Sequence, residues 1–267
     1  MTVHSVNCDH VEFCELRTVI EMSNTYRIFP TALDLAERLA SDLADKIEKA
    51  EKDNSPINLA LSGGNTPKLL FTVLAEKYHS SLNWSFINLF WVDERCVSPD
   101  DPESNYGMTY RLLLEKIDIP MQNIHRMKGE NDPGMEAVRY SEELLRYINL
   151  KNGLPVFDII LLGMGEDGHT ASIFPGNIES FNSASICEQA RHPVSGQRRV
   201  TLTGKVINNA REIIFLVTGK NKADIVHEII KEREAFLEYP AANIHSEKGK
   251  ITWLLDKEAG MHLELLQ

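Results

Sequence analysis

The sequence has little positive charge. It contains 28 Lys and Arg against 39 Asp and Glu, which gives its 267 residues a formal net charge of −11. A protein that binds nucleic acids or anionic membranes generally needs a basic face, so we exclude both as partners. A small anionic ligand remains possible, because a few cations gathered in one cleft create a local positive field.

Long apolar runs and cysteines are also scarce. The longest apolar stretches, such as 156–162, are far shorter than the roughly 20 residues that cross a bilayer. The first 25 residues carry Asp9, Glu12, Glu15 and Glu21 in place of the apolar core of a signal peptide. The 4 cysteines are too few for the disulfide framework of a secreted domain. We therefore expect a soluble cytoplasmic protein.

One group of metal-ligating residue types does occur near the N-terminus. His4, Cys8, His10 and Cys14 are side chains that zinc accepts. No tight Cys-x-x-Cys pair is among them, and N-terminal segments of proteins are often poorly ordered. We interpret the cluster as adventitious and predict neither a metal ion nor an organic cofactor.

The chain from about residue 26 onward repeats one unit, an apolar strand followed by a polar or Gly-rich turn and a helix. The pattern predicts strands at 57–61, 87–92, 157–162, 199–202, 213–217 and 251–255, and helices at 31–52, 67–78, 106–116, 135–149 and 222–231. This alternation is typical of a Rossmann-like α/β fold, a mostly parallel twisted sheet with helices on both faces. We predict an N-terminal extension over residues 1–25 and a single α/β domain over residues 26–267.

Polar turns follow four of the predicted strands, at 62–67, 93–95, 163–169 and 218–222. Ligands of parallel α/β sheets bind outside the carboxyl ends of the strands. We therefore expect these four turns to converge on one cleft.

The turn at 62–67 reads Ser-Gly-Gly-Asn-Thr-Pro. Its two glycines let the backbone approach a ligand closely, and the helix that follows offers free N–H groups and a partial positive charge. It lacks the Gly-Lys-Ser/Thr ending of a P-loop. The turn is a candidate phosphate or sugar site, with a plain tight turn as the alternative.

The turn at 163–168 has the letters G-x-G-x-x-G of a dinucleotide site. We reject that site, because such a turn must open a full-length helix and Pro175-Gly176 interrupts the chain within two turns. The glycines would instead present Asp167 and His169 at a strand end. A histidine titrates near neutral pH and can act as a general base. The alternative is a core or surface histidine without a chemical role.

Cations stand at the remaining turns. Arg95, beside Asp93, could hold a carboxylate, a phosphate or a developing oxyanion through paired hydrogen bonds, or could form only a surface ion pair. Lys220 and Lys222 lie at a predicted helix start, where the helix dipole disfavours a cation. Either lysine is thus a candidate phosphate contact.

Two further cations, Arg198 and Arg199, precede a predicted strand and are weaker candidates.

Together these stretches resemble the 6-phosphogluconolactonase family. The matching segments, in family order, are LALSGGNTP at 59–67, FWVDER at 90–95, ESNYGM at 103–108, FDIILLGMGEDGHTASIFPG at 157–176, RRVTLT at 198–203, INNAREIIFLVTGKNKA at 207–223 and YPAANI at 239–244. The resemblance covers most of the chain from about residue 30. It implies a deaminase/isomerase-type fold and the hydrolysis of 6-phospho-D-glucono-1,5-lactone to 6-phosphogluconate, in the oxidative pentose phosphate pathway, without a cofactor.

The resemblance also implies roles for individual residues. His169 would be the base that activates water, with Asp167 orienting it, and Arg95 would contact the substrate or its developing charge. Lys222 stands at the lysine of the family's TG-x-x-K-A match and is preferred to Lys220 for the phosphate. The remaining substrate- or phosphate-binding candidates are Ser62, Gly63, Gly64, Thr66, Asp93 and Arg199.

Alternatives from other classes stay open. Glucosamine-6-phosphate deaminases resemble this chain at several turns, but after the histidine they carry Phe-Asn-Glu-Pro, whose Glu assists ring opening. This chain has Ser-Ile-Phe-Pro at 172–175, and Arg95 where the deaminase pattern has a tyrosine. A related sugar-phosphate isomerase is a further possibility. A non-catalytic sugar-phosphate-binding protein would not need a group that titrates near pH 7.

One loop departs from the family pattern. Relatives are often Pro-rich where this chain has His-Pro-Val-Ser-Gly-Gln at 192–197, a loop that could touch the substrate. The expected ligand is a small phosphorylated sugar lactone, and the sequence carries no signal for an oligomeric state.

Overall fold

The computed structural model of this chain describes residues 25–176, 179–233, 236–246 and 249–263. The predicted N-terminal extension, with its cluster at His4, Cys8, His10 and Cys14, therefore lies outside the described residues except for Thr25. That residue opens the first strand, β1 (Thr25–Phe29).

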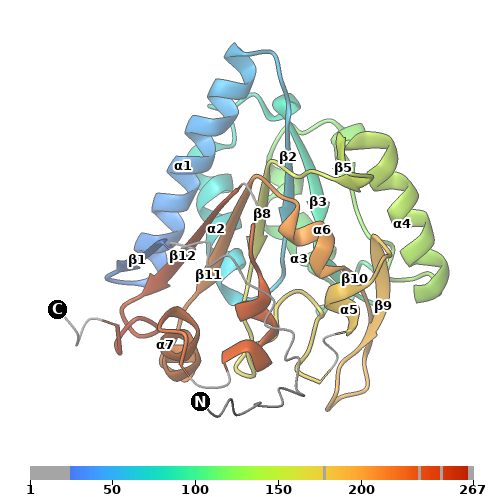
Figure 1. The fold of residues 1–267 in the computed structure, drawn as a ribbon. Helices are drawn as coiled ribbons and strands as arrows, with labels where there is room; N and C mark the ends of the chain where they lie inside the picture. The colour runs from blue at the N-terminus through green and yellow to red at the C-terminus, as the bar shows by residue number, and fades with distance from the viewer. Residues whose placement is uncertain (1–24, 177–178, 234–235, 247–248, 264–267) are drawn as a thin grey trace, which may run out of the picture.

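Within the described residues, the central sheet has 7 strands in the order β1-β12-β11-β8-β2-β3-β5 (Figure 1). Every neighbouring pair is parallel. Besides β1, the strands are β2 (Ile57–Leu61), β3 (Ile87–Trp91), β5 (Ile124–His125), β8 (Ile159–Leu162), β11 (Glu212–Val217) and β12 (Lys250–Asp256). The chain moves outward from β2 through β3 to β5, then returns to β8 on the other side of β2. The strand order therefore changes direction between β2 and β8.

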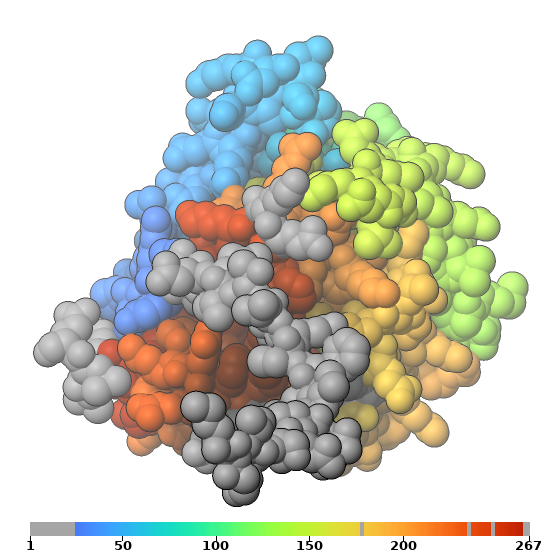
Figure 2. All heavy atoms as spheres, in the orientation of Figure 1, coloured from blue at the N-terminus to red at the C-terminus, as the bar shows by residue number. Residues whose placement is uncertain are grey.

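Helices cover both faces of this sheet, as predicted. They are α1 (Ala32–Lys52), α2 (Asn65–Tyr78), α3 (Asn105–Leu112), α4 (Pro133–Tyr147), α5 (Glu179–Asn182), α6 (Gly204–Asn208) and α7 (Ala223–Ile230). Short 3-10 turns are η1 (Trp84–Phe86), η2 (Leu114–Lys116), η3 (Met121–Asn123), η4 (Lys220–Lys222), η5 (Phe236–Glu238) and η6 (Pro240–Asn243). In Figure 2, α1 and α4 form opposite margins of the molecule.

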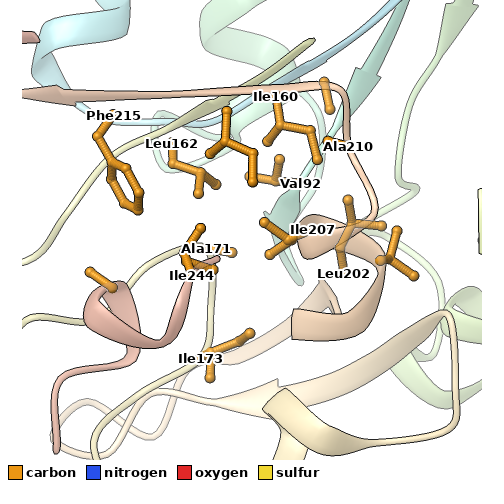
Figure 3. Packing of buried hydrophobic residues seen from close by; sticks show 14 of the residues in the cluster. Val92, Ile160, Leu162, Ala171, Ile173, Leu202, Ile207, Ala210, Phe215 and Ile244 are labelled. Atoms are coloured by element: carbon orange, nitrogen blue, oxygen red, sulfur yellow. The ribbon is translucent and has the colours of Figure 1, made fainter. Parts of the chain in front are cut away.

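Alternation along the buried strands divides the core in two. Leu59, Leu61, Leu89 and Trp91 face a cluster that includes α1 and α2. Their neighbours in sequence, such as Ala60 and Phe90, face a second cluster, which includes α4 and α6. Figure 3 shows that second cluster, to which Leu162 belongs together with Ala171 and Ile173, just after the turn at 163–169. Side chains that alternate along each strand thus give both faces an apolar surface on which helices pack.

Helix α1 shows how local sequence sets an element. Thr31 caps its first turn by accepting the backbone N–H of Asp34 at 3.1 Å. Leu35, Leu39 and Leu43 recur every four residues and are buried against the sheet.

The prediction of a turn at 93–95 was wrong. These residues form β4 (Asp93–Arg95), one strand of a separate antiparallel sheet in the order β4-β10-β9, with β9 at Cys187–Arg191 and β10 at Arg198–Leu202. The chain passes from the central sheet to this second sheet at Val92. Its N–H donates to the carbonyl of Leu61 in the central sheet at 2.9 Å, and its carbonyl accepts the N–H of Leu202 in the second sheet at 2.8 Å. The predicted strand at 199–202 exists, but it belongs to this second sheet. A third, two-stranded piece joins β6 (Leu150–Lys151) and β7 (Leu154–Pro155).

The helix predicted at 106–116 ends early. Leu113 leaves helical geometry with φ −131° and ψ −59°, and η2 follows it.

Candidate active site

A polar cleft opens at the carboxyl ends of the parallel strands, where the strand order changes direction between β2 and β8. This is the position at which open α/β sheets bind their ligands. All four polar segments predicted from the sequence contribute to it, including 93–95, which forms the strand β4. Nine candidate residues line the cleft: Ser62, Gly63, Gly64, Thr66, Asp93, Arg95, His169, Arg199 and Lys222. The tenth, Asp167, contacts His169.

The turn after β8 fixes the ring of His169. Asp167 Oδ1 accepts the backbone N–H of His169 at 3.1 Å and lies 2.5 Å from its ring Nδ1. Burial alone would raise the pKa of Asp167, but the hydrogen bonds and charge of His169 outweigh it and lower that pKa. An ionised carboxylate can only accept, so Nδ1 carries the proton and Nε2 keeps a free lone pair. Since His169 lines the cleft, its imidazole is available there as a proton acceptor.

Glycine is required at Gly165 for this arrangement. A Cβ on Gly165 would lie 2.1 Å from Nδ1 of His169 and 2.6 Å from Oδ1 of Asp167. The two side chains therefore fold back over a backbone that has no side chain of its own. Two hydrogen bonds join the two ends of the turn. The backbone N–H of Gly165 donates to the carbonyl of His169 at 2.9 Å, and Thr170 Oγ1 donates to the carbonyl of Gly163 at 2.9 Å.

A buried carboxylate, Glu94, joins β4 to the start of α3. It accepts the backbone N–H groups of Arg95 (2.8 Å), Asn105 (2.7 Å) and Tyr106 (2.8 Å), and the hydroxyl of Ser104 (3.1 Å). Burial raises the pKa of Glu94, and the three N–H groups oppose that rise. The helix start is therefore held against the strand that carries Arg95.

Asp93 is turned toward protein groups as well as the cleft. One carboxylate oxygen accepts from Asn105 Nδ2 at 3.2 Å and the other from Ser172 Oγ at 2.6 Å, while Arg199 Nη1 lies 3.9 Å from the latter oxygen. The side chain is buried, so these contacts replace water. Asp93 thus organises Asn105, Ser172 and Arg199 around the cleft.

The two cleft arginines are adjacent and incompletely paired. Arg95 and Arg199 are direct partners in the β4–β10 register. Arg95 Nη1 donates to the carbonyl of Glu103 at 2.5 Å, but the buried Nε of each arginine bonds to no described residue. Burial lowers the pKa of Arg199, and Asp93 opposes that effect. Two neighbouring guanidinium groups with spare donors form a site for an anion.

Aromatic contacts support the same edge of the cleft. The ring of Phe174 lies 4.8 Å from that of His169 and 5.1 Å from that of His192, and the Arg199 guanidinium carbon lies 5.6 Å from the ring centre. His192 belongs to the loop that departs from the family pattern. Burial lowers its pKa first, with further lowering by Arg199 and His169.

The two candidate lysines differ in their position relative to the cleft. Lys222 lines the cleft and is half-buried, whereas Lys220 is exposed and outside the cleft lining. Burial lowers the pKa of Lys222, opposed by the charges of Glu166 and Asp256. Arg198 likewise points elsewhere, to Asp132 at 3.1 Å. The cleft therefore takes its cations from Arg95, Arg199 and Lys222.

The glycine turn after β2 forms one wall of the cleft, next to Asn105. A Cβ on Gly63 would collide with Asn105 Oδ1 at 1.8 Å, and Gly64 has φ +110°, which favours glycine. Thr66 and Thr218 share a hydrogen bond of 2.8 Å between their hydroxyls. The buried hydroxyl of Ser62 has no partner among the described residues. The wall thus offers polar groups and close backbone approach.

Two contributors to the site, Asn105 and Ser172, were not predicted. Asn105 lines the cleft, and Ser172 Oγ bonds to Asp93 and lies 3.4 Å from Arg199 Nη1. Both lie in segments that resemble the family, ESNYGM and GMGEDGHTASIFPG, and that resemblance was the one available signal.

Among the described residues, no group of three or more His, Cys, Asp or Glu side chains is arranged to hold a metal ion. Nor does any described helix have the length and apolar character needed to cross a membrane.

Comparisons with known proteins agree with this geometry. Residues 30–253 match the family model described as glucosamine-6-phosphate isomerases/6-phosphogluconolactonase. The chain is 46% identical over 235 residues to a 6-phosphogluconolactonase from Haemophilus influenzae, covering 88% of this chain and 97% of that one.

Solved structures are similar over the same length. A crystal structure of a devB protein superimposes with a TM-score of 0.85 at 45% identity, covering 90% of this chain and 99% of that one. The 6-phosphogluconolactonase from Trypanosoma brucei gives a TM-score of 0.80 at 28% identity, with 91% and 99% coverage.

Proposed function

This chain belongs to the glucosamine-6-phosphate isomerase/6-phosphogluconolactonase family, and we propose that it hydrolyses 6-phospho-D-glucono-1,5-lactone to 6-phosphogluconate. The reaction belongs to the oxidative pentose phosphate pathway. One observation carries the proposal: a single cleft combines a histidine oriented by a carboxylate with cations that have spare hydrogen-bond donors. The first can activate water, and the second can hold an anionic substrate.

His169 acts as the general base. With Nδ1–H directed at Asp167, Nε2 takes a proton from a water molecule that attacks the lactone carbonyl. The resulting imidazolium then gives that proton to the ring oxygen as the carbon–oxygen bond breaks. General acid–base help of this kind contributes about 10²–10⁴-fold to the rate. Asp167 stabilises the imidazolium formed midway.

The cleft cations share the substrate's negative charges. Arg95 lies on β4, the strand that also carries Asp93, and Lys222 lies at the start of α7. We assign Arg95 to the developing oxyanion and Lys222 to the phosphate, with Arg199 as a second binding cation. The glycine turn with Ser62, Gly63, Gly64 and Thr66 contacts the sugar or its phosphate. A phosphate bound far from the carbonyl provides binding energy that positions the reacting group.

The deaminase alternative is disfavoured at one position. The deaminase pattern places a glutamate where this chain has Phe174, and the Phe174 ring stands 4.8 Å from His169. A phenyl ring neither accepts nor donates a proton, so it cannot assist ring opening.

The free thiols of Cys96 and Cys187 favour a cytoplasmic location, and we propose a small-molecule substrate without a nucleic-acid partner.

The test compares 6-phosphoglucono-δ-lactone hydrolysis by wild type, His169→Asn and His262→Asn, corrected for spontaneous opening. His262 is a matched control, because it also pairs with an aspartate, Asp224 at 3.1 Å, but does not line the cleft. We expect rapid wild-type turnover, a loss of about 10²-fold or more in His169→Asn, and none in the control. No wild-type turnover above background would refute the function, and an unimpaired His169→Asn would refute the base.

A further inference from the structure

The YPAANI segment at 239–244 plays no part in the chemistry above, yet it lies against the turn that carries His169. The backbone N–H of Ala241 donates to the carbonyl of Gly168 at 3.0 Å. Ile244 and Ala171 belong to one buried cluster (Figure 3). The segment is thus bonded to Gly168 and shares a core with the residues that follow His169.

Tyr239 makes the closest contact with the turn. A Cβ on Gly168 would lie 2.5 Å from Cδ1 of Tyr239 and 2.8 Å from its Cβ and Cγ, so the ring packs directly on the glycine backbone. Gly168 itself has φ +76°, a conformation that other residues rarely adopt. The Tyr239 side chain therefore fills the space in which a side chain at position 168 would lie.

The hydroxyl of Tyr239 is bonded as well. It donates to Glu228 Oε2 on α7 at 2.6 Å, and this bond, with burial as a smaller cause, raises the pKa of Tyr239 to about 12. The hydroxyl thus stays protonated under assay conditions. Helix α7 begins directly after Lys222. The Tyr239 side chain therefore contacts both the turn that carries His169 and α7, the helix that follows the cleft residue Lys222.

The turn has little support of its own to replace this contact. Besides the Asp167–His169 bonds, its internal hydrogen bonds are those of Gly168 N–H to Gly165 at 3.2 Å, Gly165 N–H to His169 at 2.9 Å and Thr170 Oγ1 to Gly163 at 2.9 Å. Three glycines in the turn increase its freedom in the absence of outside contacts. Asp167 and the Phe174 ring contact the His169 ring directly, and the backbone that carries both His169 and Asp167 rests on what packs against Gly168.

We propose that Tyr239 is a positioning residue: its ring holds the 165–169 turn in the conformation that directs His169 into the cleft, and its hydroxyl links that turn to α7. This rests on the proposed role of His169. Tyr239 does not line the cleft and touches no reacting atom. Its effect is therefore on the geometry of the base and not on the binding of substrate.

The experiment compares Tyr239→Ala, Tyr239→Phe and a control, Tyr78→Ala. Tyr78 is also a half-buried tyrosine packed against a core cluster, but it ends α2 at the far end from the cleft. We expect Tyr239→Ala to lower kcat about 10- to 100-fold, as small misplacements of a reacting group do. KM should change by less than about threefold, because substrate contacts remain. Tyr239→Phe should recover most of the wild-type kcat, and Tyr78→Ala should retain it.

A second readout does not need activity. NMR of ring-15N-labelled histidine reports the Nδ1–H of His169 in its bond to Asp167, assigned by its loss in His169→Asn. Tyr239→Ala should shift or broaden this resonance, and Tyr239→Phe should preserve it. If the wild type shows no lactone hydrolysis, the proposed function fails, while the resonance still tests the positioning role.

Several outcomes would overturn the proposal. One is a Tyr239→Ala protein with normal kcat and an unchanged His169 resonance. Another is a loss in Tyr239→Phe equal to that in Tyr239→Ala, because then the ring is not what matters. If Tyr239→Ala does not fold, Tyr239→Leu, which keeps bulk without a flat ring, is measured in its place, and a wild-type kcat there also contradicts the proposal.

Discussion

Arg95, Arg199 and Lys222 bring three positive charges into one cleft, and the protein compensates them only in part. Asp93 is shared among several donors, and the Nε atoms of both arginines lack described partners. Buried charge without full pairing is costly to the free protein. We propose that the binding of an anion recovers this cost, and that the cleft gives up some stability in order to bind a charged ligand.

Lys222 gives a test of this trade-off. Because its pKa is lowered from 10.5, the unfolded chain binds this proton more tightly than the folded one. The stability that this group contributes is present above pH 10.5 and is lost as the pH falls through the lowered folded pKa. At neutral pH the charged lysine is therefore a net cost.

We predict that Lys222→Met raises KM for the lactone about 10- to 100-fold, because the variant loses a charge-assisted hydrogen bond to the substrate. The Tm of the variant at neutral pH should be no lower than that of wild type. Any difference in Tm between the two proteins should become smaller toward alkaline pH. The exposed Lys220→Met serves as the control and should change neither quantity. Steady-state kinetics and thermal unfolding across pH check both. An unchanged KM would remove Lys222 from the phosphate site.

Asp167 gives a second test, through the tautomer of His169. In Asp167→Asn the amide NH₂ can donate to Nδ1, which moves the ring proton to Nε2, the nitrogen that must accept. We predict that kcat falls about 10²-fold with little change in KM. The measurement is kcat and KM at saturating and limiting substrate, with circular dichroism to verify folding. A kcat near wild type would show that the carboxylate does not orient the base.

The sequence predicted the cleft residues whose chemistry is visible in their type and position. A histidine, an arginine and a lysine in turns at strand ends need no knowledge of distant partners. Asn105 and Ser172 are ordinary polar residues whose value comes from Asp93 and Glu94, and Ser172 is 79 residues from Asp93 along the chain. Such pairings are set by the tertiary fold, and local pattern does not contain them.

Secondary-structure elements were predicted best where they are buried in the parallel sheet. Apolar runs identified β2, β3, β8, β11 and β12 to within about two residues, the usual uncertainty of element ends. β5 has two residues, and β1 is a partly exposed edge strand, so neither gives a strong apolar signal. β4 was read as a turn because Asp-Glu-Arg is charged, yet Asp93 and Glu94 are buried through the hydrogen bonds that they accept.

Glu94 offers a test of how α3 and β4 are held together. A glutamine has one accepting oxygen and would direct an NH₂ group at one of the N–H donors. We predict that Glu94→Gln lowers the free energy of unfolding by about 1–3 kcal/mol. It should also reduce kcat/KM, because Arg95 and Asn105 both lose a fixed neighbour.

The matched control is Glu136→Gln. Glu136 is equally buried and accepts from Lys128 N–H (2.7 Å), Asn131 (2.8 Å) and Arg139 (2.6 Å), but it lies on α4 and does not line the cleft. Urea unfolding should show a comparable loss in both variants, whereas kinetics at a temperature where both are folded should show a defect only in Glu94→Gln. Equal kinetics in the two would mean that Glu94 acts on stability alone.

Across the molecule, the cleft is assembled at the strand-order reversal from turns that begin at Ser62 and end at Lys222. None of the described cleft residues precedes Ser62, and the match to the family model begins at residue 30. The division into residues 1–25 and 26–267 remains a prediction from sequence. From this division we predict that the first part is dispensable for the chemistry and that the strand β1 is needed for the fold.

Two truncations separate these roles. Removing residues 1–24 keeps β1, which pairs with β12 over the whole of Thr25–Phe29, and we predict a kcat/KM and Tm equal to those of the full chain. Removing residues 1–30 deletes β1, leaves the edge of β12 unpaired and takes Ile28 away from Gly260, so this variant should lose several degrees of Tm or fail to fold. Thermal unfolding and lactone kinetics on both proteins check the prediction. A loss of activity already in the shorter truncation would mean that the N-terminal segment contributes to the site, and a stable, active longer truncation would mean that β1 is not needed to complete the sheet.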